Sequence, residues 1–324
     1  MAETKIDIKK VNELQEKLNT LIDESFELLC QLNGIKTNQN EIENIVKMDP
    51  LKFDLYLCND FFNDETDMFD PDASLVAWKY YKNYYKDFFV FPKISEKSKM
   101  LWTSGNEYKR YCITFDYKND NNSNKKPSVS DTIFLTSGKN IGISGDSCFN
   151  FNKIKIRKFI HILSDIKQEK DYSQINNLVL QCFKMHHSPL NFALMPHNGG
   201  MNNVKGDGKQ GLDRFDMFLS ALKFYFENKE NPVAIKLIAE FETSQNSLLP
   251  FLKSIETFEN YLELFYPELL TKNKNKNSLC KKLIESGKES INSEDRVIEY
   301  IELAIRFWEA KLDYYNKQNQ LQKS

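Results

Sequence analysis

Two long segments, one near each end of this chain, repeat their apolar residues every three or four positions. In residues 6–33 the repeat consists of Val11, Leu14, Leu18, Leu21, Leu28 and Leu32. In residues 293–318 it consists of Val297, Ile301, Ile305, Trp308 and Leu312. Because this spacing places apolar side chains on one face of an α-helix, we predict a helix over each segment. Gly34 is the expected C-cap of the first helix and Ser293 the expected N-cap of the second.

The apolar stripe on residues 6–33 has two interpretations. It extends over about three heptads, which is marginal for a free-standing coiled coil. The helix either packs on the protein's own body or joins a second copy of the chain as a homo-oligomer. Both interpretations use the same stripe, so the sequence leaves them open.

Helical spacing also dominates most of the remaining chain. Helices are predicted near residues 41–48, from Pro71 to Phe88, and over 153–168, 172–185, 211–228, 232–242, 246–263 and 277–287. Asp49-Pro50 is expected to end the helix at 41–48, because the residue before a proline is biased away from the helical region. Residues 51–62 are apolar and aromatic, and they fit either a strand or a helix.

The middle of the chain changes to a period of two. Tyr111, Ile113 and Phe115 alternate with smaller or more polar residues, which is typical of a half-buried strand. Further strands are predicted at residues 132–135 and 141–143, and a short buried strand or extended segment at 191–196.

These patterns predict an α+β fold, predominantly α-helical with a small antiparallel β-sheet in the middle of the chain. We divide it into a helical N-terminal extension, residues 1–48, and a main α+β domain, residues 49–320. The 41% of hydrophobic residues is enough apolar material for a large core.

Composition excludes several classes of protein. Lys and Arg number 44 against 46 Asp and Glu, and the net charge of −2 gives no overall attraction to nucleic acid or to membranes. No segment approaches the roughly 20 apolar residues that cross a bilayer. The N-terminus carries no apolar region of the kind found in signal peptides. We therefore expect a cytoplasmic protein with no membrane partner.

The cysteines give no sign of a metal site. All six stand alone, at Cys30, Cys58, Cys112, Cys148, Cys182 and Cys280. None forms a C-x-x-C pair, and no histidine lies at zinc-finger spacing from a cysteine pair. His186 and His187 are adjacent and would point in different directions on a helix. The sequence predicts reduced, mostly buried thiols and no metal ligands.

The most distinctive local feature is a glycine-dense segment at residues 196–216, which holds five of the chain's 11 glycines and leads into a helical pattern. Glycine allows positive φ and a close approach of the backbone to a ligand. A helix N-terminus presents unpaired N–H groups that suit an anion. We expect a phosphate-bearing ligand, a nucleotide or nucleic acid, to bind here. The expected ligand-binding residues are Gly199, Gly200, Asn203, Lys205, Gly206, Lys209 and Arg214.

This segment matches neither standard phosphate motif, because no Lys-Ser/Thr pair follows Gly211 and no complete G-x-G-x-x-G fingerprint is present. The structural alternative is a long connection before a helix. Under that alternative, Arg214 forms a local ion pair at the helix start and contacts no external anion. His197 and Asp213 flank the segment and are the candidate catalytic residues, with His197 suited to proton transfer.

Three groups of residues resemble an uncharacterised bacterial family, domain of unknown function 6994. They are Phe69 to Asp72 leading to Trp78-Lys79-Tyr80-Tyr81, then Ile143 to Ser147, and finally Gly199-Gly200-Met201 with Asn203 to Gly206 and Asp213 to Asp216. The resemblance spans roughly residues 65–315 and leaves the N-terminal helix outside. It implies a bacterial or phage setting but no reaction.

Two functions therefore stand as hypotheses. The first is a protein that binds a phosphate-bearing ligand at residues 197–216, with an accessory or phage-defence role. The second is a non-catalytic protein that assembles through residues 6–33 and aromatic surfaces. The sequence names no cofactor and leaves open whether the protein is an enzyme.

Overall fold

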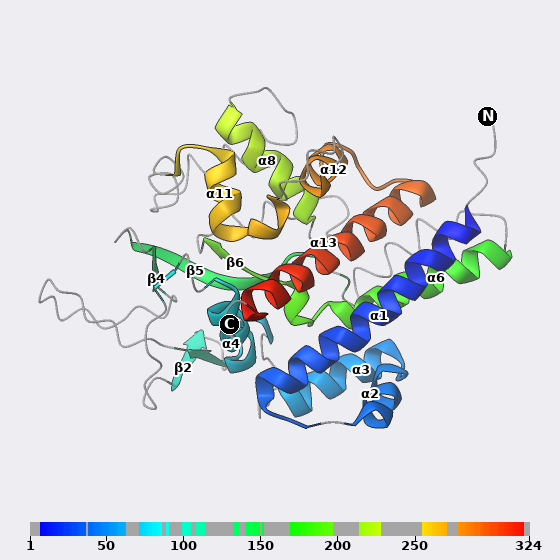
Figure 1. Cartoon of the computed structure of the whole chain (residues 1–324), viewed down its shortest axis with the longest axis horizontal. Coiled ribbons are helices and arrows are strands. Elements are labelled where there is room, and N and C mark those ends of the chain that lie inside the picture. The colour runs from blue at the N-terminus through cyan, green and yellow to red at the C-terminus, as the bar shows by residue number, and fades with distance from the viewer. Residues whose placement is uncertain are drawn as a thin grey trace, which may run out of the picture.

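A computed structural model gives the arrangement of the chain shown in Figure 1. It describes residues 7–36, 38–62, 71–85, 89–90, 99–104, 108–113, 132–135, 140–149, 151, 169–196, 214–227, 255–270 and 278–320. The helices predicted at 153–168 and 232–242 lie outside the described residues. Residues 197–213 of the glycine-dense segment also lie outside them.

The N-terminal helix α1 (Ile8–Asn33) packs on the protein's own body. Its apolar stripe is buried, and Val11 and Leu18 are 1% and 0% exposed. The helix contacts α6 (Glu169–Cys182) and α13 (Glu294–Gln320), and Figure 1 shows it running alongside α6. The packing interpretation of the stripe is confirmed. The boundary at residue 48 stays a prediction, although α1 shares one hydrophobic core with the later helices.

Residues 51–62 are helical. The helix α3 (Pro50–Tyr56) begins behind Asp49, whose carboxylate accepts a hydrogen bond from the Leu51 N–H at 3.0 Å. Pro50 occupies the first helical position, where its missing N–H costs nothing. The helix continues into a π-helical turn, η1 (Leu57–Phe61). Asp49-Pro50 therefore starts a helix as well as following α2 (Gln39–Val46).

The middle of the chain forms the sheet. Its strands are β1 (Phe89–Val90), β2 (Lys99–Ser104), β3 (Tyr108–Ile113), β4 (Thr132–Leu135), β5 (Asn140–Ser147) and β6 (Phe192–Pro196). Four of them make an antiparallel sheet in the order β1-β4-β5-β6, and β2 pairs with β3 separately. In the β5–β6 ladder Ser147 lies opposite Phe192. The predicted α+β class, predominantly helical with a small antiparallel sheet, is confirmed.

The remaining elements are mostly short helices. They are η2 (Pro71–Ala73), α4 (Leu75–Tyr84), η3 (Phe183–Met185), η4 (Pro189–Asn191), α8 (Phe215–Glu227), α11 (Phe258–Phe265), η5 (Pro267–Leu269) and α12 (Leu279–Ser286). The helix predicted from Pro71 is divided, because α4 begins after Ser74, whose hydroxyl accepts from the Ala77 N–H at 3.0 Å. No helix in the described ranges is long and apolar enough to span a bilayer.

Aromatic rings fill the centre of the core around Phe149. Its ring centroid lies 5.4–6.0 Å from those of Tyr300, Phe307 and Trp308 on α13. Phe215, at the start of α8, lies 5.6 Å away on another side. These edge and tilted arrangements are favourable for aromatic pairs, and they join the end of β5 to two helices.

Two buried ionisable side chains of opposite charge type, Lys311 and Glu268, lie beside this aromatic core. Lys311 of α13 is 0% exposed; its ammonium donates to the Phe192 carbonyl and lies 5.0 Å from the Tyr84 ring centroid. The Tyr84 hydroxyl donates to the Glu268 carboxylate at 2.6 Å. Burial lowers the pKa of Lys311 and raises that of Glu268. The opposite charges and the aromatic faces partly offset the cost of burying these groups.

One amide side chain connects three separate segments. Asn191 is 0% exposed, and its Nδ2 donates to the carbonyls of Phe149 and His186 at 2.8 and 3.0 Å. Its Oδ1 accepts from the Phe149 N–H at 3.0 Å and from Trp308 Nε1 at 3.1 Å. The amide thus uses both donors and both acceptor positions. It ties the end of β5, the turn at His186 and α13 to one another.

Replacing Asn191 with Ala should destabilise the protein by about 3 kcal/mol or more, because several buried polar groups lose their partners at once. The free energy of unfolding from denaturant titration measures this effect. Asn12→Ala, at an exposed position on α1, is the matched control and should change it little. A loss of less than about 1 kcal/mol in Asn191→Ala would contradict the role of the amide.

Candidate metal centre

The helix α3 and its π-helical continuation present two chemically active side chains on one face. Asp54 and Cys58 are four residues apart, so they point the same way from successive turns. The neighbouring face, with Phe53 and Phe61, is buried against Phe26, at centroid distances of 6.1 and 5.1 Å. Asp54 and Cys58 are consequently half-buried at the edge of the core.

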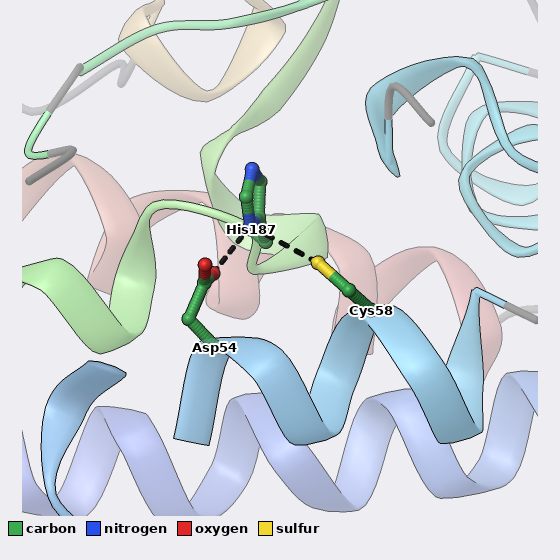
Figure 2. Close-up of side chains that lie close together, drawn as sticks. All are labelled: Asp54, Cys58 and His187. Atoms are coloured by element: carbon green, nitrogen blue, oxygen red, sulfur yellow. Dashed lines mark hydrogen bonds and ion pairs between the residues drawn. The ribbon is translucent and has the colours of Figure 1, made fainter. Parts of the chain in front are cut away.

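The third side chain comes from the turn after α6. Its residues Phe183–Met185 form the 3-10 turn η3, and the chain then turns back towards β6. His187 follows this turn and faces α3, as Figure 2 shows. Its neighbour His186 lies against Phe183, with near-parallel rings whose centroids are 6.3 Å apart. Of the two adjacent histidines, His187 is the one that reaches Asp54 and Cys58.

The three side chains converge on one ring nitrogen. His187 Nδ1 makes a short hydrogen bond with Asp54 Oδ1 and lies 3.9 Å from Cys58 Sγ. One ligand-type atom from each residue lies within 4.8 Å of the other two. The side chains of His187 and Asp54 are 18% and 20% exposed, so solvent reaches the edge of the cluster. Figure 2 shows Asp54 and Cys58 approaching the ring from the same helix.

The electrostatics of the cluster favour a protonated imidazole. Burial by itself lowers the pKa of His187, but the hydrogen bonds with Asp54 and Cys58 outweigh it and raise the pKa to about 9. At neutral pH Nδ1 therefore carries a proton and donates it towards the Asp54 carboxylate.

This geometry is not that of a nucleophile–base relay. In a Cys-His-Asp relay the thiol and the carboxylate contact different nitrogens of the imidazole. Here both contact Nδ1. Convergence of a carboxylate oxygen, a thiol sulfur and an imidazole nitrogen on one point is instead the pattern of a metal-ligand set.

Cys58 differs from the other cysteines whose side chains are described. Cys30, Cys148, Cys182 and Cys280 are buried and free of disulfides. Burial raises the pKa of the Cys280 thiol to about 12 and that of Cys182 further still. Such thiols are inert packing groups. Cys58 is the one in this set that is part-exposed and beside an imidazole.

The site predicted from the sequence falls mostly on residues that are not described. His197, Gly199, Gly200, Asn203, Lys205, Gly206, Lys209 and Asp213 all lie outside the described residues. Arg214 is described and is 0% exposed. Its guanidinium binds the Asp216 carboxylate through two hydrogen bonds of 2.9 and 2.7 Å. It also donates to the carbonyls of Ser286 and Glu289.

These contacts support the structural interpretation of Arg214, a local ion pair at the helix start. The pair joins α8 to α12, and Ser286 Oγ also donates to the Asp216 carboxylate at 2.8 Å. Gly287 completes the junction, because a Cβ atom there would lie 2.1 Å from the Asp216 carbonyl oxygen. A fully buried pair with these partners holds the helices together, and losing one member would leave the other uncompensated.

No metal ligands were expected from the sequence, because these three residues lie far apart along the chain. His187 is 133 residues from Asp54 and 129 from Cys58. The four-residue spacing of Asp54 and Cys58 would have placed both on one helix face, but residues 51–62 fitted a strand equally well.

Comparisons with family models, curated proteins and solved structures find no match, so the resemblance to domain of unknown function 6994 stays a prediction.

Replacing Asp54 with Asn in the metal-free protein should lower the pKa of His187 from about 9 towards its ordinary value of 6.5. Titration of the imidazole by NMR measures it. Asp60→Asn, at an exposed position of η1, is the control and should leave the value near 9.

The same hydrogen bonds predict how stability depends on pH. Because the folded-state pKa of His187 lies above 6.5, its contribution is complete below 6.5 and is lost as pH rises through about 9. The loss of folding stability over this pH range should be smaller in Asp54→Asn than in wild type. A wild-type His187 that titrates near 6.5 would contradict this account of the cluster.

Proposed function

We propose that this protein binds a divalent transition-metal ion of the zinc class through Asp54, Cys58 and His187. The observation that carries the proposal is the convergence of three unlike ligand atoms within 4.8 Å at a part-exposed position. Two of these ligand atoms come from one helix face, and the third comes from a turn that the Asn191 amide fixes by a hydrogen bond to the His186 carbonyl. Ligands on rigid elements are the arrangement that metal sites require.

The distances suit a tetrahedral ion after a small adjustment. Zinc bonds of about 2.3 Å to sulfur and about 2.0–2.2 Å to nitrogen and oxygen place tetrahedral ligands roughly 3.3–3.6 Å apart. The Cys58–His187 separation of 3.9 Å is close to this value. Asp54 Oδ1 is nearer to His187 Nδ1, because a hydrogen bond joins the two atoms. An ion that takes the place of the shared proton would separate the two groups slightly.

The donor set selects the kind of metal. A thiolate and an imidazole are soft or borderline ligands, which favour zinc and its neighbours over magnesium or calcium. The three ligands found among the described residues occupy three of four tetrahedral positions, and water or an external ligand could take the fourth. Three protein ligands with one open position are the arrangement of catalytic zinc sites.

Protonation competes with the metal. His187 must lose its Nδ1 proton and Cys58 its thiol proton before both can bind an ion. Because the pKa of His187 is raised to about 9, the apparent affinity should increase with pH through the neutral range.

Phosphate-ligand binding at residues 197–213 with Arg214 stays a separate prediction, and it rests on the sequence. The buried ion pair of Arg214 with Asp216 favours a structural role for that residue. Assembly through residues 6–33 gains no support from the described chain, because the apolar stripe is used inside the protein.

Zinc titration followed by calorimetry, or by competition with a chromophoric chelator, should show one site per chain. Cys58→Ser and Asp54→Asn should each weaken binding by about 100-fold, because each removes a ligand. Asp60→Asn, two residues beyond Cys58 and exposed, is the matched control and should bind like wild type. Equal zinc affinity in Cys58→Ser and wild type would contradict the site.

A further inference from the structure

A polar cleft separate from the metal centre lies between α1, α2 and the end of α6. Its volume is about 500 Å³, within the range of small-molecule sites. None of its lining residues belongs to the Asp54–Cys58–His187 cluster. The lining includes five primary amides, from Gln15, Asn19, Gln39, Asn177 and Gln181. Amides both donate and accept hydrogen bonds, so these walls suit a ligand with both kinds of group.

Part of the amide wall is already ordered. Gln15 Nε2 donates to Asn19 Oδ1 at 2.9 Å, and Asn177 Nδ2 donates to Gln15 Oε1 at 3.2 Å. This chain of three amides joins α1 to α6. The side-chain amides of Gln39 and Gln181 make no hydrogen bond within the part of the chain that the structure describes. Their side chains remain available to a ligand.

A buried ammonium group lies at one side of the cleft. Lys184 is 5% exposed, and its Nζ donates to the Val46 carbonyl at 2.6 Å. It also lies 5.8 Å from the centroid of the Phe53 ring. An ammonium has three N–H donors, and among the described residues only one is matched by a hydrogen-bond acceptor. A buried cation with unused donors favours an anionic group from a ligand.

A carboxylate that has no partner among the described residues lies nearby. Asp23 on α1 is part-buried and makes no hydrogen bond or ion pair with any described residue. Burial raises its pKa, and Glu27 and Glu43 raise it further, while Lys184 acts in the opposite direction. Asp23 and Lys184 thus influence each other, yet no contact within 4.0 Å joins them. The cleft presents a negative and a positive group that do not neutralise each other directly.

We propose that this cleft binds a zwitterionic ligand of the amino-acid class, a free amino acid or a short peptide. The ligand carboxylate binds Lys184, its ammonium binds Asp23, and its remaining polar groups bind the amide walls. A purely anionic ligand such as a phosphate would meet Asp23, while Glu43 on the same wall is already paired with Lys47 at 3.2 Å. A purely cationic ligand would meet Lys184, and an apolar ligand would leave the amides unpaired.

Calorimetry or thermal shift with matched probes tests the proposal. The probes are the free amino acids, a set of dipeptides, and for glutamine its N-acetyl derivative and its carboxamide, each of which lacks one of the two charges. A zwitterion should bind at least tenfold more tightly than either single-charge analogue, because each analogue leaves one charged side chain unpaired. Preference for free amino acids or for dipeptides identifies the source of the ligand.

Variants locate the site on the protein. Asp23→Asn should weaken binding of the zwitterion at least tenfold without weakening binding of the N-acetyl analogue, because that analogue has no ammonium to pair with the carboxylate. Gln181→Ala, on the cleft wall, should also weaken binding of the zwitterion, independently of Asp23. Glu16→Gln, exposed on α1 and outside the cleft, is the matched control and should bind like wild type.

Three results would overturn the proposal. One is equal affinity for glutamine and N-acetylglutamine. Another is wild-type affinity in both Asp23→Asn and Gln181→Ala. The third is no response to any amino acid or dipeptide at millimolar concentration from a protein that unfolds cooperatively. Zinc binding is measured separately, so its outcome does not affect this test.

Discussion

The buried amide of Asn191 fixes the part of the fold on which both sites depend. Its four hydrogen bonds join the end of β5, the turn at His186 and Trp308 of α13. Because the amide is fully buried, each bond would be expensive to leave unmade. The segment between α6 and β6 is therefore held against the core, although its regular structure is limited to two short 3-10 turns, η3 and η4.

That turn carries a functional group on each side. Lys184 extends to α2 and the polar cleft, where it donates to the Val46 carbonyl. His187, three residues later, faces α3 and meets Asp54 and Cys58. Short helical turns change direction quickly, so residues close in sequence can serve separate sites. The two sites share a support without sharing a lining residue.

The sequence predicted the features that depend on local periodicity. The helices α1 and α13 followed from their apolar stripes, and β4 and a three-residue part of β5 were predicted as strands. It could not predict the pairing of β5 with β6, because that ladder joins distant segments whose register is set by packing. The same limit explains why the proposed metal ligands were not predicted, since nothing local in the sequence connects His187 to Asp54.

Arg214 illustrates a different limit. A basic residue at a helix start fits an anion site and an internal ion pair equally well, and only its burial distinguishes them. The Asp216 partner is two residues away, yet the carbonyl acceptors on Ser286 and Glu289 are much further along the chain.

X-ray absorption at the zinc edge, on protein loaded with one equivalent of zinc, most directly tests whether Asp54, Cys58 and His187 bind the ion. The account predicts one sulfur at about 2.3 Å with nitrogen and oxygen at about 2.0–2.2 Å. A shell of nitrogen and oxygen without sulfur would contradict it.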